Sequence, residues 1–178
     1  MIGMIISDMI QYFDGDIQRV NHFLKVYGYA KAIGEMEGLD KKEQYILEIA
    51  ALTHDIGIKN SEIKYHSTAG KYQQIEGPPE ANKLLKNLCT DETIIERVCW
   101  LIAHHHIYTN ITGKDYQILV EADFLVNAFE DNMTYLAIQT AKEKIFRTTA
   151  GKKYLEDLYH SFNKHSFSRL TDNILKEF

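Results

Sequence analysis

The sequence predicts an all-α fold, a bundle of about six to eight helices in one domain that spans residues 1–178. Two observations support this class. Apolar residues recur at i, i+3, i+4 and i+7 through most of the chain, whereas strand-like alternation is scarce. A chain of about 150 residues buries roughly 68–70% of its unfolded surface, so one core can form without disulfides.

The first long helices are marked by their apolar faces and by their capping residues. A helix is expected over 16–37, because its apolar residues share one face: Ile17, Val20, Phe23, Leu24, Tyr27 and Ala30. Asp40 is a typical N-cap, with Glu43 three positions later, and a second helix is expected over 41–54. Gly57 is expected to end this helix.

The rest of the chain continues the helical pattern after one irregular segment. Residues 59–77 are polar and the least regular, and Pro78 and Pro79 are expected in the first turn of the next helix. Further helices are expected over 79–89, 90–106, 116–130, 134–146 and 151–162. The segment 134–178 is expected to pack as C-terminal helices on the preceding part.

Composition and charge exclude several classes of function. Lys and Arg number 20 against 25 Asp and Glu, a net charge of −5, so no basic field attracts duplex nucleic acid or an anionic membrane. Cys89 and Cys99 have no CxxC spacing and are expected to be buried free thiols. The N-terminus lacks the basic region of a signal peptide, and no apolar stretch is long enough to span a membrane. We therefore expect a cytoplasmic protein.

Four ionisable residues lie within, or at the end of, stretches that are predicted to be apolar helices. His22 lies in the middle of the first long helix, His54 and Asp55 close the second, and Asp123 lies within the apolar stretch VEADFLV. A buried carboxylate is costly without a partner. The sequence must therefore supply a hydrogen-bond partner or a metal ion.

The order His22, His54-Asp55, Asp123, with HDIG at a helix end, resembles the H…HD…D signature of the HD-domain metal-dependent phosphohydrolases. The resemblance covers about residues 18–130 and implies that these four side chains bind one divalent cation. Neighbouring residues on a helix point about 100° apart, so a helix end helps both members of the pair to reach the same ion. Mixed nitrogen and oxygen ligands suit Mn, Fe, Co, Ni or Zn and tolerate Mg.

The resemblance also raises the prospect of a second metal. Some branches of the family use extra histidines, and His105, three positions after Ile102, is the best candidate in the run of three histidines. Glu76 stands where those branches have another histidine before a proline. Two alternatives stay open here: Glu76 and His105 are ligands of a second ion, or they form an acid–base wall that orients the substrate.

The function that the resemblance implies is hydrolysis of a nucleotide or other phosphate ester by metal-activated water. Asp55 would bind the metal, and His105 or Glu76 would orient water or protonate the leaving oxygen. The segment after HDIG would bind the substrate. Its phosphate would be held by Lys59, Lys64 and Lys71, and a base would stack on Tyr72. A solvated loop is the alternative for this segment.

Two other functions and one assembly are also compatible with the sequence. An HD-fold di-iron oxygenase has similar ligands, and a non-catalytic HD module would bind a nucleotide without turnover. The expected partner is a phosphorylated small molecule, first of all a nucleotide. The apolar N-terminal stretch MIGMII would suit a homodimer.

Overall fold

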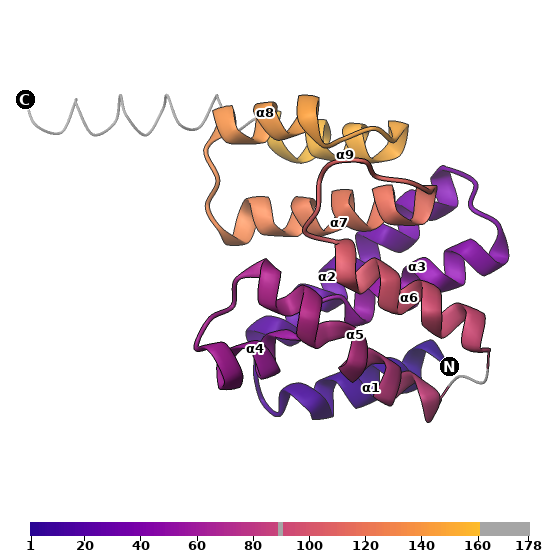
Figure 1. The fold of residues 1–178 in the computed structure, drawn as a ribbon. Helices are drawn as coiled ribbons and strands as arrows, with labels where there is room; N and C mark the ends of the chain where they lie inside the picture. Colours follow the sequence, from indigo (N-terminus) through magenta and orange to yellow (C-terminus); the bar gives the residue numbers. More distant parts are fainter. Residues whose placement is uncertain (89–90, 161–178) are drawn as a thin grey trace, which may run out of the picture.

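The computed structural model describes residues 1–88 and 91–160, and this part of the chain is an all-α fold (Figure 1). It contains nine helices and no strand, which confirms the predicted class with one helix more than expected. The helices are α1 (Ile2–Phe13), α2 (Ile17–Met36), α3 (Lys41–Thr53), α4 (Ile58–Tyr65), α5 (Gly70–Lys86), α6 (Glu92–His104), α7 (Lys114–Glu130), α8 (Tyr135–Lys144) and α9 (Thr149–Tyr159).

Two helices form the centre of the bundle. Residues 46–53 of α3 and 118–126 of α7 are buried without interruption, as expected of helices that are surrounded on all sides. The two helices pack against each other, and α2 packs against both of them. The three elements that carry His22, His54-Asp55 and Asp123 are therefore neighbours in the core.

Capping side chains mark the starts of several helices, and the cap at Asp40 is the one that the sequence predicted. Asp16 accepts a hydrogen bond from the amide of Arg19 and caps α2, and Asp40 accepts from the amides of residues 42 and 43 and caps α3. Asp91 caps α6 in the same way. Each cap satisfies amides that have no partner inside the helix.

The segment after the His-Asp pair differs from the expectation. The structure places α4 and the first half of α5 where an irregular segment was expected, and Pro78 and Pro79 lie inside α5 rather than in its first turn. Proline cannot donate a backbone hydrogen bond, so local propensity disfavours this position. The helix continues across both prolines because α5 packs along α4 and α6, and this tertiary packing outweighs the local preference.

Gly57 does not have the role that the sequence suggested. It adopts a right-handed conformation (φ −72°), and α3 already ends at Thr53. A Cβ atom at this position would lie 2.6 Å from the backbone nitrogen of Gly77 and 2.8 Å from the backbone oxygen of Gln73. Glycine is needed here because the turn after α3 packs directly against the backbone of α5.

The first and last described helices pack on the centre of the bundle, and one of the two cysteines can be placed. The buried face of α1 (Ile5, Met9 and Phe13) packs on α2 and α3 of the same chain, and α9 packs on α7 and α2. Cys99 is a half-buried free thiol, while Cys89 and residues 161–178 lie outside the described residues. Across the described ranges, no helix is long and apolar enough to cross a membrane.

Candidate metal centre

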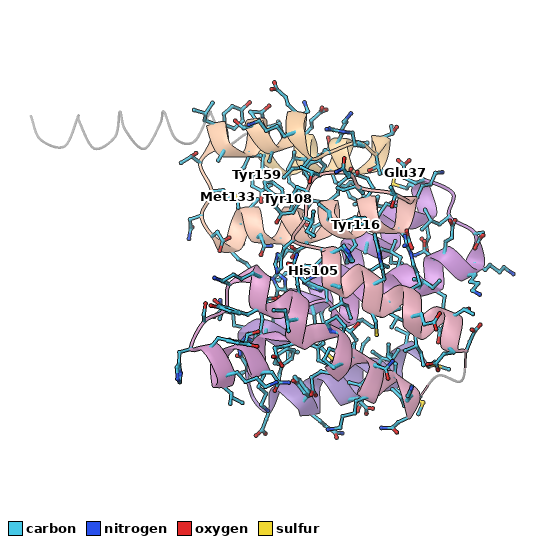
Figure 2. All side chains as sticks on the ribbon, in the orientation of Figure 1. Glu37, His105, Tyr108, Tyr116, Met133 and Tyr159 are labelled. Carbon is cyan, nitrogen blue, oxygen red and sulfur yellow. The ribbon has the colours of Figure 1, made fainter. Side chains whose placement is uncertain are left out.

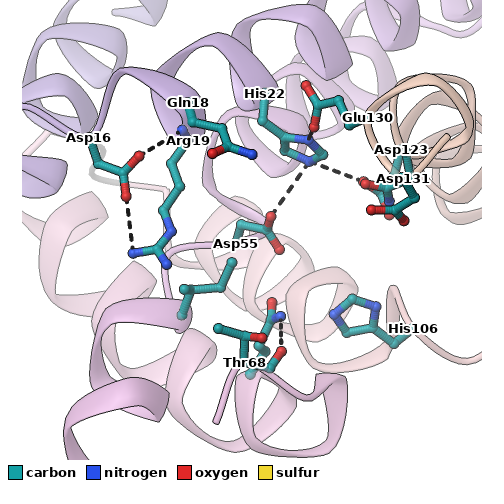
Figure 3. A pocket seen from close by; sticks show the side chains of 13 residues that line it. Asp16, Gln18, Arg19, His22, Asp55, Thr68, His106, Asp123, Glu130 and Asp131 are labelled. Carbon is teal, nitrogen blue, oxygen red and sulfur yellow. Dashed lines mark hydrogen bonds and ion pairs between the residues drawn. The ribbon is translucent and has the colours of Figure 1, made fainter. Parts of the chain in front are cut away.

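The four side chains that the sequence singled out meet at one point in the structure. The Nε2 atom of His22 lies 3.2 Å from Nε2 of His54 and 3.2 Å from Oδ1 of Asp123. The Oδ2 atom of Asp55 lies 3.5 Å from the Nε2 atoms of both histidines. Figure 3 shows His22 between Asp55 and Asp123, with their polar atoms turned toward one another.

These separations suit the ligands of one divalent ion. Ligand atoms about 2.1 Å from an ion lie roughly 3.0 Å apart at right angles and roughly 3.4 Å apart in a tetrahedron. The distances of 3.2 to 3.5 Å between the four side chains are close to this range. Two imidazoles and two carboxylates also form a donor set that borderline metals prefer.

A second group of donors adjoins the first and shares Asp55 with it. The ligand atoms of Asp55, His105 and His106 all lie within 4.8 Å of one another, as do those of His22, His54 and Asp123 in the first group. The Oδ1 atom of Asp55 lies 3.6 Å from Nε2 of His105, whereas its Oδ2 atom faces the first group. One carboxylate therefore offers an oxygen to each group.

The Nε2 atoms of His105 and His106 are buried and have no hydrogen-bond partner among the described residues. A buried polar atom without a partner costs about 1–3 kcal/mol. An ion bound at this second group would satisfy both nitrogens. His105 lies in the interior of the bundle (Figure 2) and is completely buried.

The three consecutive histidines at the end of α6 do not all have the same surroundings. His105 and His106 turn toward Asp55, and their rings lie 3.9 Å apart. His104 instead stacks on Trp100 and is in neither donor group. Tyr116 positions this end of α6, because its hydroxyl lies within hydrogen-bond distance of the backbone oxygens of residues 104 and 107, one of which accepts its proton.

The outer nitrogens of the histidines are held by partners that turn Nε2 inward. Nδ1 of His54 lies 2.8 Å from the backbone oxygen of Ala51, and Nδ1 of His105 lies 2.8 Å from that of Ile102. Nδ1 of His22 lies 2.8 Å from the carboxylate of Glu130. A partner of this kind fixes the tautomer and the ring orientation of a metal-binding histidine.

The electrostatics of the first group favour positive charge. Burial lowers the pKa of His22, but the hydrogen bond to Asp123 and the charge of Asp55 raise it to about 9. The pKa of His54 is also raised, against its burial, chiefly by the charge of Asp55. Burial would raise the pKa of both carboxyls, yet His54 lowers that of Asp55, and the hydrogen bond from His22 lowers that of Asp123. Two ionised carboxylates therefore create a point that attracts a cation.

Residues 19–149 match the sequence family described as HD domain. The chain belongs to the HD domain family. The match includes both donor groups and extends from α2 to the start of α9. Among proteins with curated functions, none matches this chain.

The fold of this HD domain is shared with a solved structure. The crystal structure of a predicted HD superfamily hydrolase from an uncultured Thermotogales bacterium has a TM-score of 0.67 to this chain and 24% sequence identity. The match covers 96% of this chain and 90% of the other. At this identity the likeness establishes the fold.

Glu76, which the sequence predicts as a ligand or an acid–base residue, is in neither of the two donor groups. Its carboxylate accepts hydrogen bonds from the ammonium of Lys64 at 2.5 Å and from the hydroxyl of Tyr65 at 3.0 Å. The hydrogen bond from Lys64 lowers the pKa of Glu76. Both of its oxygens are thus occupied by partners from α4, a helix that the sequence did not reveal.

The expected substrate-binding side chains are also engaged elsewhere. Lys59 donates to the backbone oxygen of Tyr12, and Lys64 is paired with Glu76. The Tyr72 ring stacks on Tyr65 at 4.3 Å, and the Lys71 ammonium lies 4.7 Å from the Tyr72 ring centroid. None of these expected residues lines the cavity over the donor groups.

That cavity has a volume of about 430 Å³ and is lined by residues that sequence reasoning missed (Figure 3). Asn127 and Glu130 lie four and seven positions after Asp123, so helical periodicity places them on the same face of α7. Arg19 lies one turn before His22 on α2. These spacings could have revealed all three residues. No spacing reveals Gln73, which reaches the cavity only because α5 folds back against the turn after α3.

Proposed function

We propose that this HD domain is a metal-dependent phosphohydrolase that acts on a nucleotide or other phosphate ester. One observation carries the proposal. The carboxylate of Asp55 offers Oδ2 to the first donor group and Oδ1 to the second. Asp55, His22, Asp123 and His106 line a cavity large enough for a small ligand.

The residues divide into two sets of ligands. His22, His54, Asp123 and Oδ2 of Asp55 would hold one ion, and His105, His106 and Oδ1 of Asp55 would hold a second. Divalent ions would polarise a phosphoryl oxygen and make water a stronger nucleophile at neutral pH. In the hydrolysis, the oxygen of water forms a bond to phosphorus, the ester P–O bond breaks, and a proton passes to the leaving alcohol oxygen.

The protein's own contribution is to keep the ligands in place before the substrate binds. The backbone oxygens of Ala51 and Ile102 and the carboxylate of Glu130 orient three imidazoles. Such preorganisation lowers the reorganisation needed when charge develops in the transition state. Arg19 is fixed in the cavity wall by Glu62, at 2.7 and 3.0 Å.

The test is the variant Asp55→Ala, which removes the one side chain that both groups share. We expect the purified variant to lose bound metal and to lose hydrolysis of p-nitrophenyl phosphate and of a nucleotide panel. Metal content by elemental analysis and turnover by phosphate release are the measurements. Asp8→Ala on α1, outside the cavity, is the matched control.

Two results would contradict the proposal. One is an Asp55→Ala protein that hydrolyses phosphate esters as fast as the wild type. The other is a metal-loaded wild-type protein that hydrolyses no nucleotide, sugar phosphate or aryl phosphate. Oxygen uptake by the iron-loaded protein, or nucleotide binding without turnover, would then point to the oxygenase or to the non-catalytic module.

A further inference from the structure

The cavity over the donor groups has an unusually polar lining for a site that would bind a nucleobase. Its wall contains the amides of Gln18, Gln73 and Asn127 and the hydroxyl-bearing Thr68. Ile58 is the one aliphatic residue among the described residues that line it, and no phenylalanine, tyrosine or tryptophan is among them. Aromatic stacking is worth about 1–3 kcal/mol per base where proteins use it, and this wall offers no such surface.

The charge of the lining disfavours a chain of phosphates. Five carboxylates reach the cavity, and Arg19 is the one lysine or arginine that the described part of the chain places there; the carboxylates are Asp16, Asp55, Asp123, Glu130 and Asp131. The guanidinium is already paired with Glu62, and it lies 3.3 Å from Asp16. Asp55 and Asp123 would be balanced by the ions that they hold. Away from the donor groups, each additional phosphate would still meet the carboxylates of Asp16, Glu130 and Asp131, which carry charge of the same sign. The cavity therefore suits one phosphoryl group, placed at the donor groups.

Gln73 supplies the most specific feature of the wall. The residue is 5% exposed, and the Nε2 atom of its side chain donates a hydrogen bond to the backbone oxygen of Thr68 at 2.7 Å. Since a carbonyl oxygen can only accept, this bond determines which end of the amide is the donor. The Oε1 atom is left buried and without a hydrogen-bond partner in the described part of the chain.

A buried acceptor without a partner costs about 1–3 kcal/mol, and a donor from a ligand would remove this cost. Phosphate oxygens cannot supply that donor at neutral pH, because they are acceptors there. A hydroxyl group of the substrate can. The neighbouring amides of Gln18 and Asn127 can both donate to and accept from further hydroxyls.

We propose that the substrate is the monophosphate ester of a small polyhydroxylated alcohol, a sugar or polyol phosphate, and that Gln73 accepts a hydrogen bond from one of its hydroxyls. The proposal rests on the phosphohydrolase function proposed above and narrows its substrate class. The volume of about 430 Å³ is within the range of small-molecule sites.

The experiment compares four substrates with full-length, metal-loaded protein: glucose 6-phosphate, p-nitrophenyl phosphate, AMP and ATP. For the wild type, we expect kcat/KM to be highest for glucose 6-phosphate and lowest for ATP. For Gln73→Leu, we expect the ratio of kcat/KM for glucose 6-phosphate to that for p-nitrophenyl phosphate to fall about tenfold, mainly through KM, because the aryl group has no hydroxyl to lose. Gln74→Leu is the matched control, since Gln74 does not line the cavity.

The possible failures are distinguishable. If the wild type hydrolyses none of the four compounds, the phosphohydrolase function fails and this inference fails with it. If it hydrolyses p-nitrophenyl phosphate but prefers AMP or ATP to glucose 6-phosphate, the function stands and the inference is overturned. An unchanged substrate ratio in Gln73→Leu would overturn the role of Gln73, and the wild-type ranking tests the substrate class even if that variant does not fold.

Discussion

His22 shows how a candidate ligand is held in place by residues outside the donor groups. Its Nε2 atom faces the donor group, while its Nδ1 atom lies 2.8 Å from Glu130, whose carboxylate also accepts a hydrogen bond from Lys25. Burial would raise the pKa of Glu130, but its bonds with Lys25 and His22 lower it, so the carboxylate stays ionised. Glu130 is therefore a positioning residue for His22.

Replacement of Glu130 by alanine is expected to weaken metal binding about ten- to hundredfold while the fold is retained. Without its partner, the imidazole of His22 loses the contact that fixes its tautomer and its orientation. Isothermal titration with Mn²⁺ measures the affinity, and circular dichroism checks the fold. Glu96→Ala, at an exposed position of α6, is the control, and equal affinities in the two variants would contradict the role of Glu130.

At the scale of helices, the turn that carries His54 and Asp55 is held by direct contact with α5. Gly57 in this turn meets Gly77 of α5, and a Cβ atom at Gly77 would lie 2.6 Å from the Ile102 side chain of α6. Two glycines thus allow three elements to pack closely beside the donor groups. The backbone atoms around Gly57 cannot move away as a flexible side chain could.

The variant Gly57→Ala is expected to lower the free energy of unfolding by about 1–3 kcal/mol, as overpacking does in a closely packed core. The same exchange at Gly28 of α2, where a Cβ atom would meet open space, is expected to raise it by roughly 0.5–1 kcal/mol. Chemical denaturation measures both. A Gly57→Ala protein as stable as Gly28→Ala would show that the turn and α5 are not in firm contact.

For the whole molecule, the donor groups would couple metal binding to stability. Six candidate ligand side chains come from α2, the turn after α3, the end of α6 and α7, so an ion bound there would join elements that are far apart in the sequence. A ligand that binds only the folded state stabilises it by mass action, with about 2.7 kcal/mol at a concentration 100 times its Kd.

Removal of metal with EDTA is therefore expected to lower the Tm by roughly 5–10 °C relative to protein saturated with Mn²⁺, since 1 kcal/mol corresponds to about 2–4 °C in a chain of this size. Differential scanning calorimetry is the measurement. The Asp55→Ala variant lacks a carboxylate that both donor groups use, so its Tm should differ little between EDTA and Mn²⁺. An equal Tm for the wild type in both conditions would argue against a resident ion.

Much of this protein follows from its sequence alone. The apolar periodicity and the cap at Asp40 determine the helical class. The order His22, His54-Asp55, Asp123 identified four side chains that meet in the structure, where the Nε2 atoms of the two histidines lie 3.2 to 3.5 Å from each other and from the two carboxylates. Local propensity predicts the helices because it acts over a few residues, whereas the four side chains were identified by their resemblance to the HD-domain signature.

Only the tertiary structure decided which other residues reach the site. Glu76 was expected there but pairs with Lys64 and Tyr65, while Gln73, three positions earlier on the same helix, lines the cavity. The difference depends on which face of α5 lies against the turn after α3 and on how closely the two approach. The contact between Gly57 and Gly77 determines this approach. Packing between elements far apart in the chain has no local signal, so a sequence can place donors on helices without showing which faces of neighbouring helices complete the site.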